Sequence, residues 1–293
     1  MPRLVRIACA FAATTSLCKA QNLAQYVLPN MGDSNGGNTF PGVSLPFGVV
    51  KLGPDLYTGS DSYSGYQPTG NFIGFSLLHE SGTGGAPKYG VVAQMPVPGT
   101  INNPLVDLGV NRSKADEPRL GYYKSSLSNG ITVEMSATNR AGMLKYEFPA
   151  GQGASNVVVD VSHVLSSYRG QGLGQSYLGG NISVTTTDAS VRYQGSGSYD
   201  NGWNRAPKWT VFFCGYFDQP ATFKTFLGKD ATGITLVDYD GSSSQGSQAR
   251  LGAVFTFNAT SVTSRVGVSF ISSEQACTNG AFQNHDDRHI QRD

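Results

Sequence analysis

The feature that most constrains this chain is an alternation of apolar and polar residues with a period of two, which recurs roughly every 10 to 15 residues. Successive side chains of a β-strand point to opposite faces, so these runs predict strands with one buried face. No helical period continues beyond about ten residues. The expected strands are 43–52, 72–78, 89–95, 131–137, 143–148, 156–161, 182–187, 209–217, 221–226, 234–239, 253–258 and 262–271.

So many strands in one chain must close into a barrel or stack as two sheets, because each strand has to bury one face. Asn129-Gly130 lies between two runs and predicts a two-residue hairpin turn, since both residues tolerate a positive φ. No change in composition marks a linker inside residues 21–275. We therefore expect an all-β fold, one large antiparallel β-sandwich over 21–275, followed by a linker or disordered tail at 276–293.

Charge excludes several classes of protein. The 21 basic and 20 acidic residues leave a net charge of +1, which argues against a nucleic-acid partner, because such proteins need a basic surface. Charged residues make up only 14% of the chain, which is unlike a coiled coil or a helical bundle. Hydrophobic residues make up 39% and occur along the whole chain, which argues against intrinsic disorder.

Residues 1–20 have the pattern of a secretory signal peptide. Arg3 and Arg6 precede a short apolar stretch, and small residues occupy the positions of a cleavage site at Cys18-Lys19-Ala20. No later stretch reaches the roughly 18 apolar residues of a membrane span, so we expect a secreted protein with no membrane partner. Three sequons fit this route and predict N-glycosylation at Asn111, Asn181 and Asn258.

Two cysteines remain after the predicted signal peptide, Cys214 and Cys277, and both lie in strand-like sequence. In an oxidising compartment they are expected to pair, and a bridge closing about 63 residues would stabilise the fold by about 4 kcal/mol. Two buried free thiols are the alternative, because sequence does not supply the geometry of a bridge.

Two segments, 30–47 and 56–85, are rich in Gly, Ser, Thr, Asn and Tyr and read as long loops. Long loops on a sheet scaffold are often functional. The first loop has no Lys or Arg and no strand–loop–helix unit surrounds it, which argues against a phosphate site. Hydroxyls, amides and aromatic rings suit a neutral polyol better.

The two loops and the segment between them carry motifs that resemble the N-terminal domain of glycoside hydrolase family 92, over residues 26–277. The motifs are Phe40-Pro41-Gly42, Pro46-Phe47-Gly48, Leu52-Gly53-Pro54-Asp55, Gly74-Phe75-Ser76 and Ser81-Gly82-Thr83-Gly84, and 268–276 resembles the last strand of that domain. The resemblance implies secreted, calcium-dependent exo-α-mannosidases that act with inversion. It also implies a galactose-mutarotase-like β-sandwich, in agreement with the period of two.

The resemblance implies that both loops line one sugar pocket. His79 is either a sugar ligand or a residue that anchors its loop, and Tyr63 and Tyr66 are either a platform for a sugar ring or packing residues. His163 is interpreted as a filler of core or surface, and Trp203 and Trp209 as core residues. The expected substrate-binding residues are Asn38, Thr39, Phe40, Gly42, Asp55, Tyr66, His79, Ser81, Gly82 and Thr83.

The chain also departs from the family pattern. Asn38 stands where members often have a histidine, and Leu77-Leu78 stands where many have a second one. The family's catalytic acid, base and most calcium ligands lie in a following (α/α)-barrel domain, to which no residues here correspond. We therefore expect no catalytic residue, metal site or cofactor in this chain, with calcium bound mostly by the other domain.

The remaining acidic residues have ordinary explanations. An inverting glycosidase needs two carboxyl groups about 6.5–9.5 Å apart, and Asp55, Asp61 and Glu80 are more readily explained by turns and loop hydrogen bonds. The tail 285–289 contains two histidines and two aspartates, and is read as a polar chain end rather than a metal site.

The expected function is that of the substrate-shaping, carbohydrate-binding N-terminal domain of a secreted α-mannosidase acting on α-mannosides of glycoproteins, inactive alone. Its expected partners are mannose-containing glycans and the C-terminal catalytic domain. The alternative is a stand-alone secreted lectin-like protein without hydrolase activity.

Overall fold

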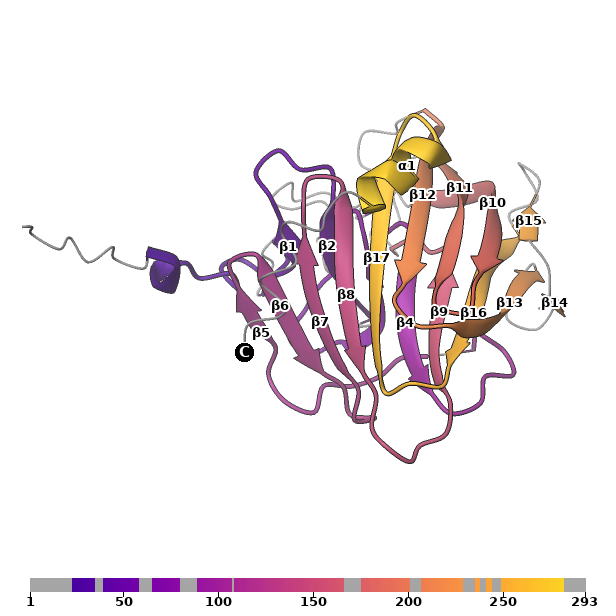
Figure 1. Ribbon diagram of the computed structural model, residues 1–293. Helices are drawn as coiled ribbons and strands as arrows, with labels where there is room; N and C mark the ends of the chain where they lie inside the picture. The colour runs from indigo at the N-terminus through magenta and orange to yellow at the C-terminus, as the bar shows by residue number, and fades with distance from the viewer. Residues whose placement is uncertain are drawn as a thin grey trace, which may run out of the picture.

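Two antiparallel β-sheets face one another in this protein, whose structure is a computed structural model (Figure 1). The structure describes residues 23–34, 39–57, 65–79, 89–106, 108–165, 175–200, 207–228, 235–237, 241–243 and 249–281. The all-β sandwich predicted from the period of two is therefore confirmed.

One sheet has eight strands. The strands are, in order across the sheet, β1 (Val43–Ser44), β2 (Lys51–Tyr57), β3 (Asn71–Ser76), β4 (Ala93–Pro98), β9 (Ser155–Asp160), β16 (Arg250–Phe257), β13 (Ala221–Gly228) and β14 (Thr235–Val237). Asp55 and Leu56 of β2 pair with Gly74 and Phe72, so Ile73 is the extra residue of a β-bulge in β3.

The other sheet has nine strands. They are, in order, β15 (Gly241–Ser243), β10 (Ser176–Thr186), β11 (Val191–Asp200), β12 (Trp209–Phe217), β17 (Ser261–Ser269), β8 (Ala141–Glu147), β7 (Thr132–Ala137), β6 (Tyr122–Ser126) and β5 (Glu117–Arg119). The hairpin expected at Asn129-Gly130 joins β6 to β7, but its loop has three residues, 128–130, because Leu127 still pairs with Ile131. Gly130 takes the positive φ, +87°, that closes such a loop.

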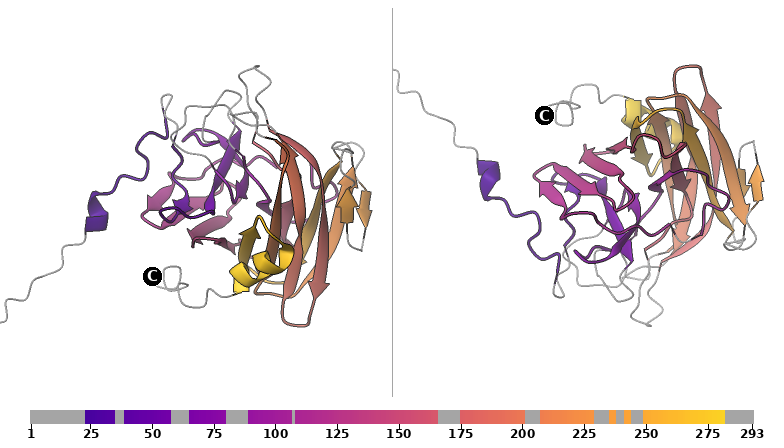
Figure 2. Two further views of the ribbon diagram at one scale, coloured as in Figure 1. Left: turned by 90° about the horizontal axis from the view of Figure 1, so that it is seen from above. Right: turned by 90° about the horizontal axis from the view of Figure 1, so that it is seen from below.

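Two short helices complete the described chain, the 3-10 helix η1 (Leu23–Tyr26) and the α-helix α1 (Ser273–Ala281). η1 projects away from the sandwich, whereas α1 packs on β12 and β17 (Figures 1 and 2). No helix in the described part of the chain is long and apolar enough to cross a membrane.

The main core lies between the sheets, where Val157 and Val159 of β9 meet rings such as Tyr193 and Phe213. Val158 points the other way and joins a smaller apolar cluster on the outer face of the eight-stranded sheet. Because both faces of β9 are covered, its sequence is a continuous apolar run rather than an alternating one. The residues that cover the outer cluster are Val97, Ile101, Leu105 and Leu108.

The buried side-chain amide of Gln94 forms hydrogen bonds from one sheet to the other through this core. Gln94 of β4 donates from Nε2 to the Tyr193 hydroxyl and to Ser264 Oγ, both at 2.9 Å, and its Oε1 accepts a hydrogen bond from the Tyr146 hydroxyl at 2.9 Å. The three partners lie on β11, β17 and β8 of the opposite sheet. Burying an amide is costly unless it is hydrogen-bonded, and here both ends of the amide are satisfied.

The predicted strand 43–52 was wrong in its bounds. The run 43–52 is divided between β1 and β2 by a turn, in which Phe47 adopts φ +61°. Strand β11 was not predicted, because its central residues 195–198 are all Gly or Ser. Glycine is required there: a Cβ on Gly195 would lie 2.0 Å from the backbone oxygen of Asn181 and 2.9 Å from the ring of Phe213.

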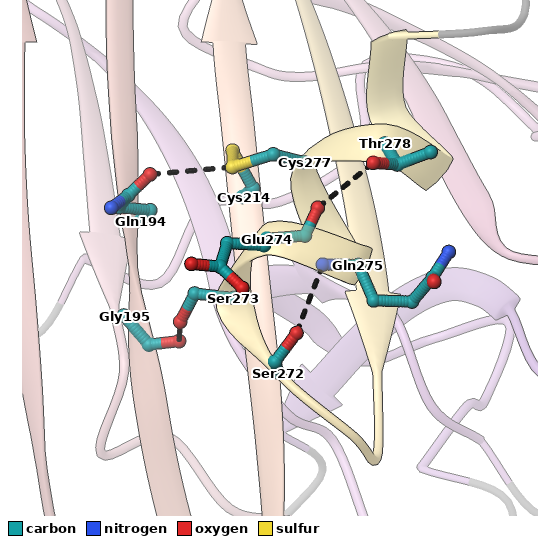
Figure 3. The surroundings of a disulfide bond; sticks show 9 residues. All are labelled: Gln194, Gly195, Cys214, Ser272, Ser273, Glu274, Gln275, Cys277 and Thr278. Atoms are coloured by element: carbon teal, nitrogen blue, oxygen red, sulfur yellow. Dashed lines mark hydrogen bonds between the residues drawn. A yellow bond between two sulfur atoms is a disulfide. The ribbon is translucent and has the colours of Figure 1, made fainter.

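Cys214 of β12 and Cys277 are joined by a disulfide, with their Cα atoms 4.7 Å apart (Figure 3). The prediction that Cys277 lies in a strand was wrong, because β17 ends at Ser269 and Cys277 belongs to α1, which begins at Ser273. Ser272 caps the helix by accepting a hydrogen bond from the backbone N–H of Gln275 at 3.1 Å. The bridge therefore fixes a helix to the nine-stranded sheet.

Candidate functional site

The strand register brings several chain connections to one end of the sandwich, which we call the α1 end (top of Figure 1). In the eight-stranded sheet the last residue of β9 pairs with the first of β4 and lies beside the start of β16. In the nine-stranded sheet the start of β10 pairs with the end of β11, and the end of β17 pairs with β12 near its start. The prediction of a loop over 56–85 was wrong in part, because β3 lies within it. The segment that follows β3 begins at the same end of the sandwich as α1.

A buried carboxylate, Asp55, is the centre of the candidate site. Its side chain is fully enclosed, and its Oδ1 accepts hydrogen bonds from Ser76 Oγ at 2.9 Å and from His79 Nε2 at 2.6 Å. Its Oδ2 accepts a bond from His163 Nε2 at 2.8 Å. Asp55 thus connects β2, the end of β3 and the segment after β9.

The hydrogen bonds of His79 define its protonation. Nδ1 lies 2.8 Å from the backbone oxygen of Lys51, and a carbonyl oxygen only accepts, so Nδ1 carries a proton. Nε2 faces the carboxylate of Asp55 and also donates when that group is ionised. His79 and Asp55 therefore form an imidazolium–carboxylate pair, in which neither side chain is exposed.

The pKa of Asp55 reflects two opposing effects. Burial raises it, because a charged carboxylate is poorly solvated inside the protein. The positive charge of His79 and the hydrogen bonds from His163 and His79 lower it, and together they hold the pKa of Asp55 well below its usual range. The carboxylate therefore stays ionised and is an unsuitable general acid.

The first loop meets the second through Phe40. The Phe40 ring stacks on the His79 ring, with centroids 4.7 Å apart and an interplanar angle of 24°. Gly53 makes this stack possible, because a Cβ there would lie 2.7 Å from the Phe40 ring and 3.4 Å from His79. Thr39 is half-buried and donates from Oγ1 to the backbone oxygen of Met31 at 2.7 Å.

The structure therefore brings together five of the expected substrate-binding residues. Phe40 and Thr39 remain partly accessible, whereas Asp55 and His79 are enclosed beneath the stack. The fifth, Gly42, allows close packing, since a Cβ there would lie 2.3 Å from the backbone oxygen of Leu52.

Tyr66 belongs to a different cluster. Its buried hydroxyl donates to Asp116 Oδ2 at 2.7 Å, and Arg112 donates from Nε to the same oxygen at 2.8 Å. Burial and the negative charge of Asp116 raise the pKa of Tyr66 well above its ordinary value. The guanidinium of Arg112 lies over the rings of Tyr66 and Phe72, so Tyr66 is a packing residue in this structure.

Other predicted residues have the following places. Trp209 is half-buried and packs on Tyr199 and Tyr89, in keeping with a core role. The three sequon residues Asn111, Asn181 and Asn258 are exposed. Outside the described residues lie Asn38, Asp61, Tyr63, Glu80, Ser81, Gly82, Thr83, Trp203 and the tail 285–289.

His163 was assigned no partner from sequence, and the structure gives it one. It lies 108 residues from Asp55, and only the pairing of β2, β3, β4 and β9 brings them together. Sequence reasoning also missed a neighbouring cluster, in which Ser162 donates to Asp160 Oδ1 at 2.5 Å and Arg250 donates from Nε to Ser162 Oγ at 2.7 Å. No short motif signals either contact, because both depend on sheet topology.

The described residues do not fit a calcium ion. Calcium takes six to eight oxygen ligands, several of them carboxylates. No group of three or more His, Cys, Asp or Glu side chains that could hold a metal occurs among the residues that the structure describes. The oxygens of Asp55 are already used by three donors, so we derive no chemical step through a metal in this part of the chain.

Comparison with known proteins identifies the family. Residues 26–269 match the model of the glycosyl hydrolase family 92 N-terminal domain. The chain belongs to glycosyl hydrolase family 92. The resemblance inferred from the loop motifs is therefore confirmed, and the match ends at the last residue of β17.

Relatives of this family 92 chain are longer. An uncharacterized secreted glycosidase of Arthroderma benhamiae is 29% identical over 303 residues, which cover 88% of this chain and 34% of the relative. The chain spans about a third of the length of this curated relative.

Solved structures of family 92 share the fold. The glycosyl hydrolase ccman5 matches with a TM-score of 0.74 and 24% identity, over 88% of this chain and 34% of its own. A family 92 α-mannosidase of Bacteroides thetaiotaomicron matches with a TM-score of 0.71 and 23% identity, over 90% of this chain and 35% of its own.

Proposed function

We propose that this chain is the substrate-shaping N-terminal domain of a secreted α-mannosidase that acts on α-mannosides of glycoproteins. The observation that carries the proposal is the stack of Phe40 on His79, which joins the two loops above the buried Asp55. Solved relatives described as α-mannosidases, one in complex with mannoimidazole, support the substrate class.

In this proposal the buried residues hold the loops in position, and the accessible residues bind the sugar. Asp55 and His79 are enclosed, so they act as positioning residues that fix the chain where the two loops meet. Thr39 and Phe40 lie nearer the surface and supply a hydroxyl and a ring edge to a sugar. Asn38, Ser81, Gly82 and Thr83 are the proposed further contacts.

The rest of the enzyme is proposed to cover an apolar surface at the α1 end. Phe47 is fully exposed at 106% and is held at φ +61°, a backbone conformation that costs an L-residue about 1–2 kcal/mol. Phe270 and Ile271 are exposed at 56% and 77% between β17 and α1. Both segments bond the tip of the β7–β8 hairpin, so they lie at the same end. Exposed apolar side chains in a strained turn are typical of a contact surface.

Hydrolysis is proposed to need groups outside this chain. An inverting mechanism requires a carboxylic acid and a carboxylate about 6.5–9.5 Å apart across the scissile bond. Asp55 is ionised, enclosed and bonded to three donors, so it does not serve as either group. The catalytic pair and the calcium ligands are accordingly proposed to lie in the C-terminal barrel domain.

Binding and turnover measurements on purified residues 21–293 test the proposal. We expect methyl α-mannoside to bind in the millimolar range or more weakly, because one domain supplies only part of the pocket. Phe40→Ala should abolish this binding, whereas Leu120→Ala, at an exposed residue between β5 and β6, should not change it. No mannose should be released, with or without calcium.

Two results would contradict the proposal. Mannose release that a single substitution at Asp55 abolishes would place the chemistry in this chain. Tight, micromolar binding by a strict monomer would favour the stand-alone lectin-like protein instead.

A further inference from the structure

A hollow of about 530 Å³ lies on the outer side of the eight-stranded sheet at the α1 end. It is bounded by the end of β9, the first residues of β10 and β16, and the residues Pro104, Leu105, Val106 and Leu108. Its volume falls within the range of about 300–1,000 Å³ that is typical of small-molecule sites. The Phe40 ring is not among the residues that line it.

The floor of the hollow is a preorganised polar cluster. Ser162 Oγ donates to Asp160 Oδ1 and accepts bonds from Arg250 Nε at 2.7 Å and from the Leu251 backbone N–H at 3.2 Å. Arg250 also pairs with Asp160 Oδ2 through Nη2. The guanidinium side chain remains 38% exposed, so it presents further N–H donors to the hollow.

His163 supplies a second ring nitrogen at the same place. Its Nε2 donates to the Asp55 carboxylate, and no described residue bonds Nδ1. Because His163 lines the hollow, the donors of Arg250 and the Nδ1 atom of His163 occur together.

The charge and the walls define the chemical class of the ligand. The charges of Asp160 and Arg250 cancel, so the floor has no net charge that would select an anion or a cation. Hydroxyl groups both donate and accept, which suits this mixed floor. Leu105 and Leu108 form an apolar wall that is anchored in the outer cluster of the sheet, and such a wall packs against the C–H face of a sugar ring.

We propose that this hollow is a second carbohydrate-binding site, which takes one neutral hexose unit and is distinct from the pocket proposed at Phe40. Arg250 and Asp160 bond neighbouring hydroxyls, His163 bonds a third through Nδ1, and the wall formed by Leu105, Val106 and Leu108 carries the ring. The site would hold a branch of a glycan while another branch enters the proposed pocket.

Protein-observed NMR of the complete chain tests this site, with D-mannose and D-glucose as neutral probes and sodium sulfate as an anionic one. We expect the hexoses to shift the backbone amides of Val106, Ser162 and Ser176. Ser176→Trp places a ring in the hollow from an exposed position and should weaken that binding at least tenfold. Thr222→Trp is the matched control, because Thr222 is exposed and lines a hollow elsewhere on the sheet.

Each outcome separates this site from the proposed function. Hexose shifts confined to residues 39, 40 and 79 would overturn the second site and leave the proposed function intact. Shifts with sulfate but not with hexoses would make it an anion site and also overturn the inference. If Ser176→Trp does not fold, Val106→Ser, which removes part of the exposed wall, must weaken hexose binding while leaving the shifts near Phe40 unchanged.

Discussion

Replacing Asp55 by asparagine removes the charge of the buried centre and leaves its shape almost unchanged. The new amide oxygen can still accept from Ser76, and His163 can change tautomer to accept from the amide NH₂. His79 has no such alternative, because both of its ring nitrogens face acceptors, Lys51 O and the new amide oxygen. The imidazolium either loses its counter-charge or gives up one hydrogen bond.

The expected cost follows from that loss. An unpaired buried donor or acceptor costs about 1–3 kcal/mol, and breaking a buried ion pair costs about 3–5 kcal/mol. We therefore expect Asp55→Asn to lower the free energy of unfolding by about 3 kcal/mol. For a domain of this size the melting temperature should fall by about 6–12 °C.

Chemical and thermal unfolding of the purified chain measure this effect, and two variants control it. Asp218→Asn makes the same substitution at an exposed carboxylate that accepts one backbone N–H, so its effect should stay within about 0.5 kcal/mol. His163→Gln keeps an N–H donor toward Asp55 and should cost less than Asp55→Asn. An Asp55→Asn protein as stable as the Asp218→Asn protein would refute the buried ion pair.

The difference in stability between the wild-type and Asp55→Asn proteins should depend on pH in a defined direction. The pKa of Asp55 is lower in the folded protein than its ordinary value of 3.8, so below about pH 4 the unfolded chain binds the additional proton. The stability from this carboxylate is fully present above that pH and is lost as the pH falls. The difference between the wild-type and Asp55→Asn proteins should shrink below pH 4, and a difference that grows there would reverse the reasoning.

The remaining predictions concern the bridge and the exposed turn. Replacing Cys214 and Cys277 by serine together should lower stability by about 4 kcal/mol in urea unfolding, because the bridge closes a loop of 63 residues, and an unchanged midpoint would contradict this. Phe47→Gly should leave stability unchanged or raise it by up to about 1 kcal/mol, because glycine accepts the positive φ of the turn. The same variant should self-associate less in sedimentation than the wild type, and equal association would argue against a contact surface at Phe47.

The sequence predicted the sandwich because a strand with one buried face has alternating apolar and polar residues. It did not predict β11, because Gly195, which makes room for the Phe213 ring, and Gly197 interrupt the alternation of apolar and polar side chains. It also placed Cys277 in a strand, although Ser272 with Gln275 three residues later is a capping signature that could have indicated the helix.

The candidate site was predicted only in part. Phe40, Asp55 and His79 were recognised from motifs, and the structure brings them together. Their arrangement, with Asp55 and His79 enclosed and Phe40 outside, depends on tertiary packing, which cannot be predicted from the motifs alone. His163 could not be assigned from sequence, since its bond to Asp55 exists only after four strands have paired.

The hydrogen bonds of Gln94 have a consequence for how the two sheets align. Its partners on β8, β11 and β17 sit at fixed positions in the opposite sheet, so a shift of one layer against the other breaks all three bonds at once. Apolar contacts alone would tolerate such sliding, because they have little directionality. The hydrogen bonds of Gln94 in the core therefore fix the position of one sheet relative to the other. Loops at either end can change length or sequence during evolution without moving the strands from which they extend.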